Sequence, residues 1–185
     1  METKNKKPNA LSIIIHVGID FRIEKNVVFV KGEKGEVHKG FKPIIKIEKI
    51  DNKIVLTTDS DRRRIRAIAG AAEADIKNMI KGVTKGVIYK LKVVYSHFPV
   101  NLKLQGDSLL IENFLGEKHP RKAQILNGAT VNINGRDIEV RGINKEVVAQ
   151  TAANIEHATS IKKWDPRVFQ DGIYIHEKDG KSLLR

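Results

Sequence analysis

The fold is decided by two stretches of the sequence, GIDFRIEKNVVFVKGEKGE (Gly18–Glu36) and PVNLKLQGDSLLIENFLGE (Pro99–Glu117). They align without a gap, each residue of the first standing 81 positions before its partner in the second. In both copies apolar residues alternate with polar ones over two short runs, and a polar turn separates the runs. Such alternation is typical of half-buried strands. A repeat of this length predicts an internal duplication.

Each copy leads toward a predicted helix. KIVLTTD (Lys53–Asp59) resembles DIEVRGI (Asp137–Ile143), and each precedes a segment in which apolar residues recur every three or four positions. The first apolar stripe consists of Ile65, Ile68, Ala69, Ala72, Ile76, Met79, Ile80 and Val83. The second consists of Val147, Val148, Thr151, Ala152 and Ile155.

The residues flanking the stripes predict the helix ends. Asp59 or Ser60 is the expected N-terminal cap of the first helix, and Gly82 or Gly86 is its expected end. Asn144 is the expected cap of the second helix.

The sequence therefore predicts an α+β protein made of two similar domains, each an antiparallel or mixed sheet with one main helix packed on a face. We place the domains at residues 1–84 and 85–185, with residues 1–10 as a flexible arm. The alternating strand in Val87–Phe98 should open the second domain and match the stretch around Leu11–Val17.

The composition points to a polyanionic partner. The chain of 185 residues carries 34 Lys+Arg against 22 Asp+Glu, a net charge of +12 that both halves share. Nucleic acid is the first expectation and an anionic membrane surface the second, with a merely well-solvated charged surface as the alternative. The absence of cysteine excludes disulfides and thiolate chemistry. No apolar run is long enough to span a membrane, and the polar, lysine-rich start predicts a cytoplasmic protein.

Glycines in FVKGEKGEVHKGF (Phe29–Phe41) raise the question of a phosphate-binding loop. A nucleotide-hydrolase loop needs lysine directly after its last glycine, where this chain has Phe41. The second copy of the repeat keeps only one of the glycines, which a triphosphate site would not tolerate. We therefore interpret Gly32 and Gly35 as positions of positive φ in a tight turn.

No pattern typical of an enzyme is present. The six histidines are scattered, His176 lacks a second histidine four residues on, and no serine lies in a nucleophile-elbow motif. The sequence predicts no catalytic residue, no metal ligand and no cofactor. An enzyme acting on nucleotides or nucleic acid remains the alternative from a different class.

Basic clusters mark the candidate contacts with nucleic acid. EKHPRK (Glu117–Lys122) follows the glycine of the second copy and is expected to be an exposed loop, and DRRRIR (Asp61–Arg66) opens the first helix. The segment after the second helix interleaves aromatic and basic residues, a mixture that suits RNA because aromatic rings can stack on bases and guanidinium groups can pair with phosphate. These residues are Lys162, Lys163, Trp164, Arg167, Phe169 and Tyr174. Alternatively, Trp164 and Phe169 cover an exposed end of the second domain.

Four segments carry a family resemblance: VYSHFPV, ENFLGEKHPRKA, EVRGINKEVVAQTAANIEHAT and RVFQDGIYI. With them the chain resembles the ribosomal protein L6 family of the large subunit, in its archaeal and eukaryotic branch. The similarity extends from about Leu11 to Lys181. Trp164 departs from the family, in which a less bulky residue is often found, and so does the tail after Gly180.

The resemblance implies a non-catalytic structural constituent of the large ribosomal subunit. It implies binding of ribosomal RNA near the sarcin–ricin loop and the site of the translational GTPases, with neighbouring ribosomal proteins as further partners. It also implies that the second domain and the C-terminal segment make most of the RNA contact. The matching positions here are Lys118, Arg121, Lys122, Lys162, Lys163, Arg167, Phe169, Gln170 and Gly172, to which the aromatic pattern adds Trp164. A free-standing RNA-binding module outside the ribosome is the alternative.

Overall fold

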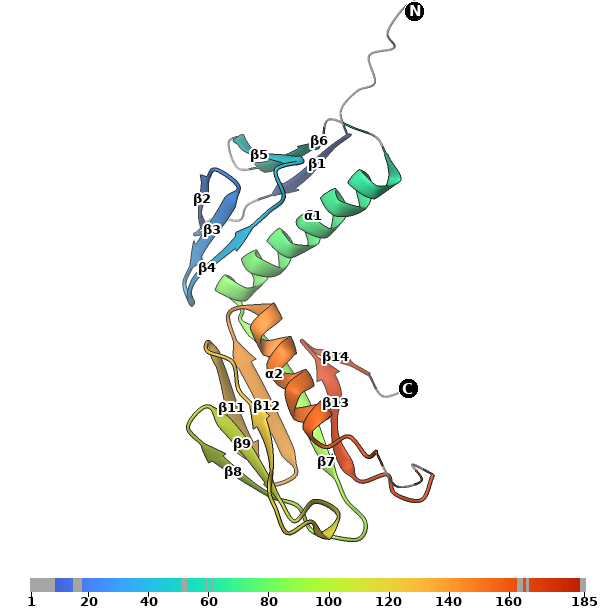
Figure 1. Ribbon diagram of the computed structural model, residues 1–185. Coiled ribbons are helices and arrows are strands. Elements are labelled where there is room, and N and C mark those ends of the chain that lie inside the picture. The colour runs from blue at the N-terminus through green and yellow to red at the C-terminus, as the bar shows by residue number, and fades with distance from the viewer. Residues whose placement is uncertain are drawn as a thin grey trace, which may run out of the picture. The chain divides into compact units, whose positions relative to one another are not determined.

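The computed structural model describes residues 9–14, 18–50, 53–58, 60, 62–162, 165 and 167–183 (Figure 1). The chain divides into two compact units, Met1–Lys85 and Gly86–Arg185.

The first unit has its described strands in two antiparallel sheets, ordered β1-β6-β5 and β2-β3-β4, with one helix packed against β1, β3, β4 and β6. Its elements are β1 (Asn9–Ile14), β2 (Asp20–Glu24), β3 (Val27–Gly32), β4 (Gly35–Gly40), β5 (Ile45–Ile50), β6 (Lys53–Thr58) and α1 (Arg63–Thr84). The predicted apolar stripe faces the sheets, since Ala69, Ala72, Ile76, Met79 and Val83 are buried.

The glycine-rich stretch is a β-hairpin, as predicted, and glycine is needed at positions 32 and 35 for different reasons. Gly35 has a φ of +141°. Gly32 does not have a positive φ, so that part of the prediction is wrong. A Cβ at Gly32 would lie 2.8 Å from Val83 Cγ2 and 2.9 Å from the Val83 carbonyl oxygen. The backbone N–H of Lys34 donates to the same oxygen at 3.0 Å. The hairpin turn thus docks on the C-terminal end of α1.

The predicted ends of α1 are partly correct. Arg62 occupies the N-cap position without a side-chain hydrogen bond to the helix, and Ser60 Oγ accepts only from the Arg62 N–H at 3.4 Å. The other candidate, Asp59, lies outside the described residues. At the C-terminal end Gly86 follows the cap residue with a φ of +75°, whereas Gly82 lies within the helix.

The second unit contains a five-stranded sheet, ordered β11-β12-β7-β13-β14, and a three-stranded sheet, ordered β10-β9-β8. Its elements are β7 (Val87–Val94), β8 (Asn101–Gln105), β9 (Ser108–Glu112), η1 (Phe114–Gly116), β10 (Arg121–Gln124), β11 (Ala129–Asn134), β12 (Asp137–Gly142), α2 (Lys145–Ala158), β13 (Gly172–Lys178) and β14 (Lys181–Ser182). The Asn144 side chain caps α2, as predicted, by accepting from the Glu146 N–H at 2.9 Å.

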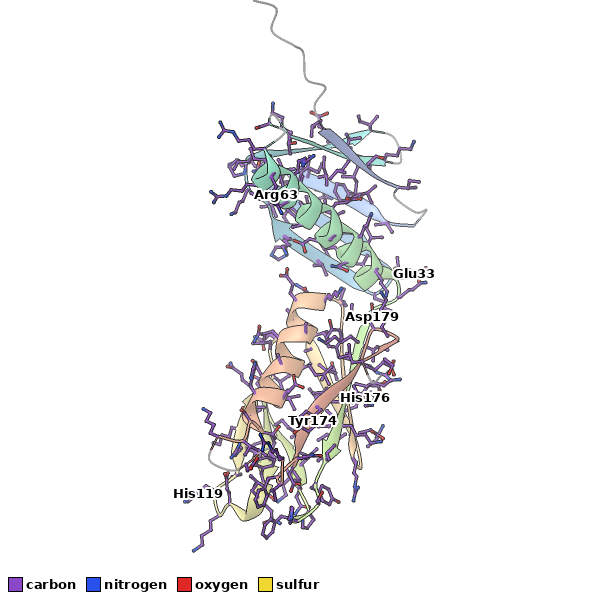
Figure 2. The ribbon with its side chains drawn as sticks, turned by 90° about the vertical axis from the view of Figure 1, so that its right-hand side faces the viewer. Glu33, Arg63, His119, Tyr174, His176 and Asp179 are labelled. Carbon is purple, nitrogen blue, oxygen red and sulfur yellow. The ribbon has the colours of Figure 1, made fainter. Side chains whose placement is uncertain are left out.

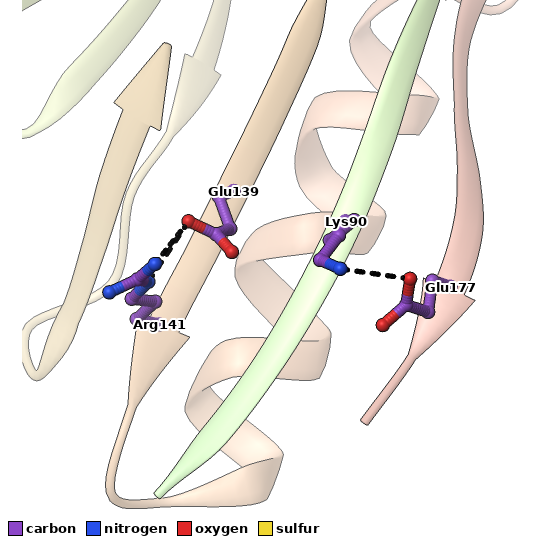
Figure 3. A network of polar contacts seen from close by, with 4 residues as sticks. All are labelled: Lys90, Glu139, Arg141 and Glu177. Carbon is purple, nitrogen blue, oxygen red and sulfur yellow. Dashed lines mark hydrogen bonds and ion pairs between the residues drawn. The ribbon is translucent and has the colours of Figure 1, made fainter. Parts of the chain in front are cut away.

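The core of this unit lies between α2 and the sheets, around the fully buried Leu91, Ile111, Ile138 and Ile155. The opposite face of the five-stranded sheet carries ion pairs (Figure 3). Lys90 Nζ lies 3.0 Å from Glu177 Oε2, and Arg141 Nη2 lies 2.5 Å from Glu139 Oε2. Because one face is apolar and the other charged, the strands alternate as the sequence predicts.

The duplication is confirmed by strand order and register. The order β11-β12-β7 repeats β5-β6-β1, and β8-β9-β10 repeats β2-β3-β4. Asp20 pairs with Lys31 in the first hairpin, and Asn101 pairs with Glu112, each 81 positions further on, in the second. The two units are therefore similar α+β domains.

One correspondence differs from the expected one. Ile13 on β1 faces Ile54, and Leu91 on β7 faces Ile138. Ile13 therefore matches Leu91, 78 positions further on, and the first strand is displaced by three residues from the offset of the repeat. The second unit also has an addition without counterpart in the described part of the first: β13 and β14 extend its sheet beyond β7.

Candidate nucleic-acid interface

Three connections of the second unit meet at the C-terminal end of β7, and we call this region the loop end. They are residues 95–100, residues 113–120 and the described residues between α2 and β13, namely 159–162, 165 and 167–171 (Figure 1). Asn113 Nδ2 donates to the Pro99 carbonyl at 3.0 Å, which joins the first two. The Ser96 N–H donates to Asp171 Oδ1 at 3.0 Å, which joins the first and third. In Figure 2 the His119 side chain projects from this region.

Arg121 holds the loop end together, which corrects the expectation that it lies on an exposed loop. It is the first residue of β10, and only 25% of its side chain is exposed. Its Nη1 donates to the carbonyls of Ala158 and Ser160, both at 3.0 Å. Its Nε and Nη2 donate to the two oxygens of Glu117 at 2.8 and 2.6 Å. Its guanidinium lies 4.4 Å from the ring centroid of Phe114.

These contacts give Arg121 a structural role within the second unit. Two chelated carbonyls at the C-terminal end of α2, a bidentate carboxylate and an aromatic face engage most of the guanidinium. The hydrogen bonds from Arg121, with its positive charge added, hold the pKa of the Glu117 carboxyl below its usual 4.5. Arg121 fixes the connection before β10 to the end of α2.

A hollow of about 340 Å³ lies beside this arrangement. It is lined by Glu117, Arg121, His157, Ala158, Ser160, Ile161 and Lys162. The structure therefore brings the cluster Glu117–Lys122 and the start of the C-terminal segment to one place, although they lie some 40 residues apart in the sequence.

Four other predicted contacts are cations with exposed side chains: Lys118, Lys122, Lys162 and Arg167. Within the described ranges, none of them has a carboxylate close enough for an ion pair. An unpaired lysine or arginine on a structured surface can contact phosphate without first breaking an internal ion pair.

The remaining predicted residues lie on the approach to β13. Phe169 is half-buried with its ring 5.0 Å from that of His97, so its ring covers a neighbour rather than standing free. Gln170 is exposed, and its carbonyl accepts from the Tyr174 hydroxyl at 3.2 Å. Gly172 begins β13, where a Cβ would lie 2.9 Å from the end of the Tyr174 ring. Lys163 and Trp164 lie outside the described residues.

Sequence reasoning missed Asp171, which anchors the same approach. Its side chain is 1% exposed, and Oδ1 accepts the Ser96 N–H and lies 3.9 Å from His97 Nδ1. The sequence gives only a weak indication of this anchoring role, namely that Asp171 lies between Gln170 and a predicted strand. For Arg121 the sequence shows only a nearby carboxylate, Glu117, and gives no sign of the carbonyls at the end of α2.

Two lysines of the matching basic loop in the first unit, Lys34 and Lys39, make internal contacts. Lys34 Nζ donates to the Lys85 carbonyl. Lys39 Nζ forms an ion pair with Asp75 at 2.8 Å, and only 27% of its side chain is exposed. The arginine cluster is exposed at the start of α1, whose first turn contains no acidic residue. Two lysines of the hairpin are thus engaged internally, whereas none of the four exposed cations of the loop end has a carboxylate partner among the described residues.

Two further features bear on the class of site. Across the described ranges, no three His, Cys, Asp or Glu side chains are grouped so that they could hold a metal ion. None of the helices there is long and apolar enough to cross a membrane.

Comparisons with known proteins agree on one family. The model of the family "Ribosomal protein L6" matches residues 15–86 and again residues 98–172, one match in each unit. A protein of Methanobrevibacter smithii named large ribosomal subunit protein uL6 is 46% identical, over 90% of this chain and 94% of its own length. Proteins of the same name from Methanosarcina mazei and Sulfurisphaera tokodaii are 46% and 49% identical. Those alignments cover 93% and 90% of this chain, and 98% and 91% of the two relatives.

Proposed function

This chain belongs to the ribosomal protein L6 family, and we propose that it is a structural constituent of the large ribosomal subunit. The observation that carries the proposal is the near full-length similarity to proteins named for that subunit. The family is one of structural proteins rather than enzymes, which agrees with the absence of a catalytic motif in the sequence. As a ribosomal constituent the protein would work in the cytoplasm, with ribosomal RNA and neighbouring ribosomal proteins as its partners.

The second unit binds the large-subunit RNA through its loop end. Lys118, Lys122, Lys162 and Arg167 supply exposed cations that have no carboxylate partner among the residues that the structure describes. Arg121 supports the proposal indirectly, because it fixes the backbone from which Lys118 and Lys122 extend. The family resemblance further suggests that this RNA lies near the sarcin–ricin loop and the site where translational GTPases bind.

The chemistry of such a surface is positioning. Lysine and arginine contact phosphate oxygens and release counterions, which gives affinity without reading the base sequence. A surface held by Arg121, Asp171 and the ring contact of Phe169 loses little conformational freedom on binding, and this favours a single orientation on the RNA.

Filter binding to a ribosomal RNA fragment at several salt concentrations tests the proposal. We expect Lys118→Ala with Lys122→Ala to weaken binding and to reduce the slope of log K against log salt by about 0.7–0.9 per lost contact. The matched control is Lys31→Ala with Lys42→Ala, two exposed lysines of the first unit that likewise lack a carboxylate partner among the described residues. Equal losses in both double variants would contradict the assignment of the RNA surface to the loop end.

The ribosomal assignment has its own test. Tagged protein expressed in an archaeal host should sediment with large subunits through a sucrose gradient at physiological salt. Recovery only in light fractions would contradict it and would favour an RNA-binding module outside the ribosome.

A further inference from the structure

An exposed aromatic ring lies on the charged face of the five-stranded sheet. Tyr174 belongs to β13 and stands opposite Lys92 of β7. Lys92 follows Lys90 by two residues, so both point to the face on which Lys90 pairs with Glu177 (Figure 3). Tyr174 is 45% exposed, and Figure 2 shows its side chain on β13. The ring is therefore on the side of the sheet that faces away from α2 and the core.

The Tyr174 ring is held against the backbone of its own strand. A Cβ at Gly172 would lie 2.9 Å from Tyr174 Cζ, 2.9 Å from its hydroxyl oxygen and 3.0 Å from Cε2. The end of the ring therefore occupies the space above Gly172. The hydroxyl also donates to the Gln170 carbonyl at 3.2 Å. With its position fixed at both ends, the ring offers its exposed side to a ligand at little cost in conformational freedom.

The charges around the ring are balanced. The two ion pairs of Figure 3 neutralise their own charges, and Lys92 stands opposite Asp137, with both side chains exposed. Next to Gly172, on β7, Val94 adds an apolar side chain that is 38% exposed. A phosphate gains little from such a surface, whereas a planar, uncharged group gains contact with the ring. The surface is therefore suited to a nucleobase.

The loop end supplies the positive charge that this surface lacks. The connection that enters β13 carries the exposed cation Arg167 and continues to Gln170, the residue to which Tyr174 is hydrogen-bonded. The ring thus directly continues the surface at which we place the RNA backbone. Surfaces that bind single-stranded RNA combine these two parts, a basic track for the phosphates and aromatic rings on which bases stack.

We propose that the Tyr174 ring stacks on an unpaired base of the RNA whose phosphates contact the loop end. The proposal rests on the proposed function for the position of the RNA backbone, and it adds a contact to a base. A base within a duplex does not fit, because its neighbours in the helix already cover its faces. Proline-rich peptides also bind exposed aromatic rings. Such a peptide would leave the cations beside the ring unused, so we assign the ring to RNA.

The first test uses the full chain with ¹³C-labelled tyrosine and single-stranded octauridylate. We expect the ring resonances of Tyr174 to move upfield and to saturate, because a stacked base shields the ring protons. The resonances of Tyr89, which is 5% exposed, should not move. A self-complementary RNA octamer in duplex form should bind the cations of the loop end and leave the Tyr174 ring resonances unchanged.

The second test measures affinity for octauridylate at several salt concentrations. Tyr174→Leu should weaken binding about fivefold or more at each concentration. The slope of log K against log salt should stay the same, because no phosphate contact is lost. Tyr174→Phe keeps the ring and should bind within about twofold of the unmodified chain. The matched control is Phe29→Leu on β3 of the first unit, where the half-buried ring stacks on His38 with 5.6 Å between centroids. It should leave the affinity unchanged.

Thermal melts establish that the variants are folded at the assay temperature, and the ring resonances of the unmodified chain need no variant. The proposal is overturned if octauridylate does not shift the Tyr174 ring, if the duplex shifts it equally, or if Tyr174→Leu and Phe29→Leu weaken binding equally. It is also overturned if octaproline shifts the ring and octauridylate does not, which would make the surface a contact for protein.

The outcome separates this inference from the proposed function. If Lys118→Ala with Lys122→Ala weakens binding and Tyr174→Leu does not, the base contact is wrong and the loop end stands. If Tyr174→Leu weakens binding and the lysine variant does not, the loop end is wrong and the base contact stands.

Discussion

Removing the Arg121 side chain should destabilise the second unit, although a surface arginine is usually expendable. Arg121→Ala would leave the carbonyls of Ala158 and Ser160 without their charged donor and Glu117 without its partner. It would also uncover one face of the Phe114 ring, which belongs to the core. The expected consequence is loosening of the end of α2 and of the connection before β10.

The size of the effect follows from the contacts. Hydrogen bonds to charged groups are worth about 1.5–3 kcal/mol each, but water can replace part of this, since Ser160 is exposed. The pair with Glu117 adds about 0–1 kcal/mol because that carboxylate is 40% exposed, and the aromatic contact adds about 0.5–1 kcal/mol. Such contributions are not additive, and we expect a total loss of about 2–3 kcal/mol. For a unit of this length that corresponds to a fall in Tm of roughly 10–20 °C.

Thermal melts by circular dichroism, with hydrogen exchange of α2 amides to locate the change, would measure this loss. The matched control is Lys122→Ala, the next residue on β10, which is exposed and should stay within about 0.5 kcal/mol of the unmodified chain. Arg121→Lys keeps the charge but not the planar fork, so it should recover less than half of the stability. An Arg121→Ala variant that melts with the control would refute the structural role and return Arg121 to the RNA surface.

Two further predictions concern the second unit. Gly142→Ala should cost about 1–3 kcal/mol in a denaturant titration, because its Cβ would lie 2.6 Å from Val148 Cγ2 and 2.7 Å from the Gly128 carbonyl oxygen; Gly40→Ala, with no atom within 4 Å, should be neutral. Burial, with the charge of Asp179 added, raises the pKa of Tyr89 above its usual 10.0. Stability should therefore be undiminished below pH 10 and fall as the pH rises through the raised pKa, and Tyr89→Phe should flatten that fall in melts between pH 9 and 11.

The sequence predicted those parts of the fold in which local pattern and tertiary structure agree. Alternation of apolar residues predicted the hairpins of both units. Their strand register repeats with the 81-residue offset between Gly18–Glu36 and Pro99–Glu117. Most residues of the two helical stripes are buried as expected, because a stripe has only one face to turn toward a sheet, while Ile65, Ile68 and Val147 are half-buried. The cap at Asn144 followed from side-chain chemistry alone.

The sequence failed where distant segments meet. Nothing local shows that Arg121 reaches the carbonyls at the end of α2, 37 and 39 residues further on. The sequence of a basic cluster does not show which side chains form internal ion pairs, as Arg121 does, and which have no carboxylate partner among the described residues, as is true of Lys118. Glycine is likewise required at position 32 because Val83, 51 positions further on, leaves no room for a Cβ, and not because of the φ of Gly32.

The difference between the two units follows from what the chain does after each helix. After α1 the chain passes through Lys85 and Gly86 directly into β7, and no strand in the described part of the chain pairs with the outer edge of β1. After α2 it continues through residues 159–171 and returns as β13, which closes the outer edge of β7. The same return path carries Lys162 and Arg167 to the loop end. One extension of the second copy therefore both covers a strand edge and displays cations, and the described part of the first copy has no equivalent of it.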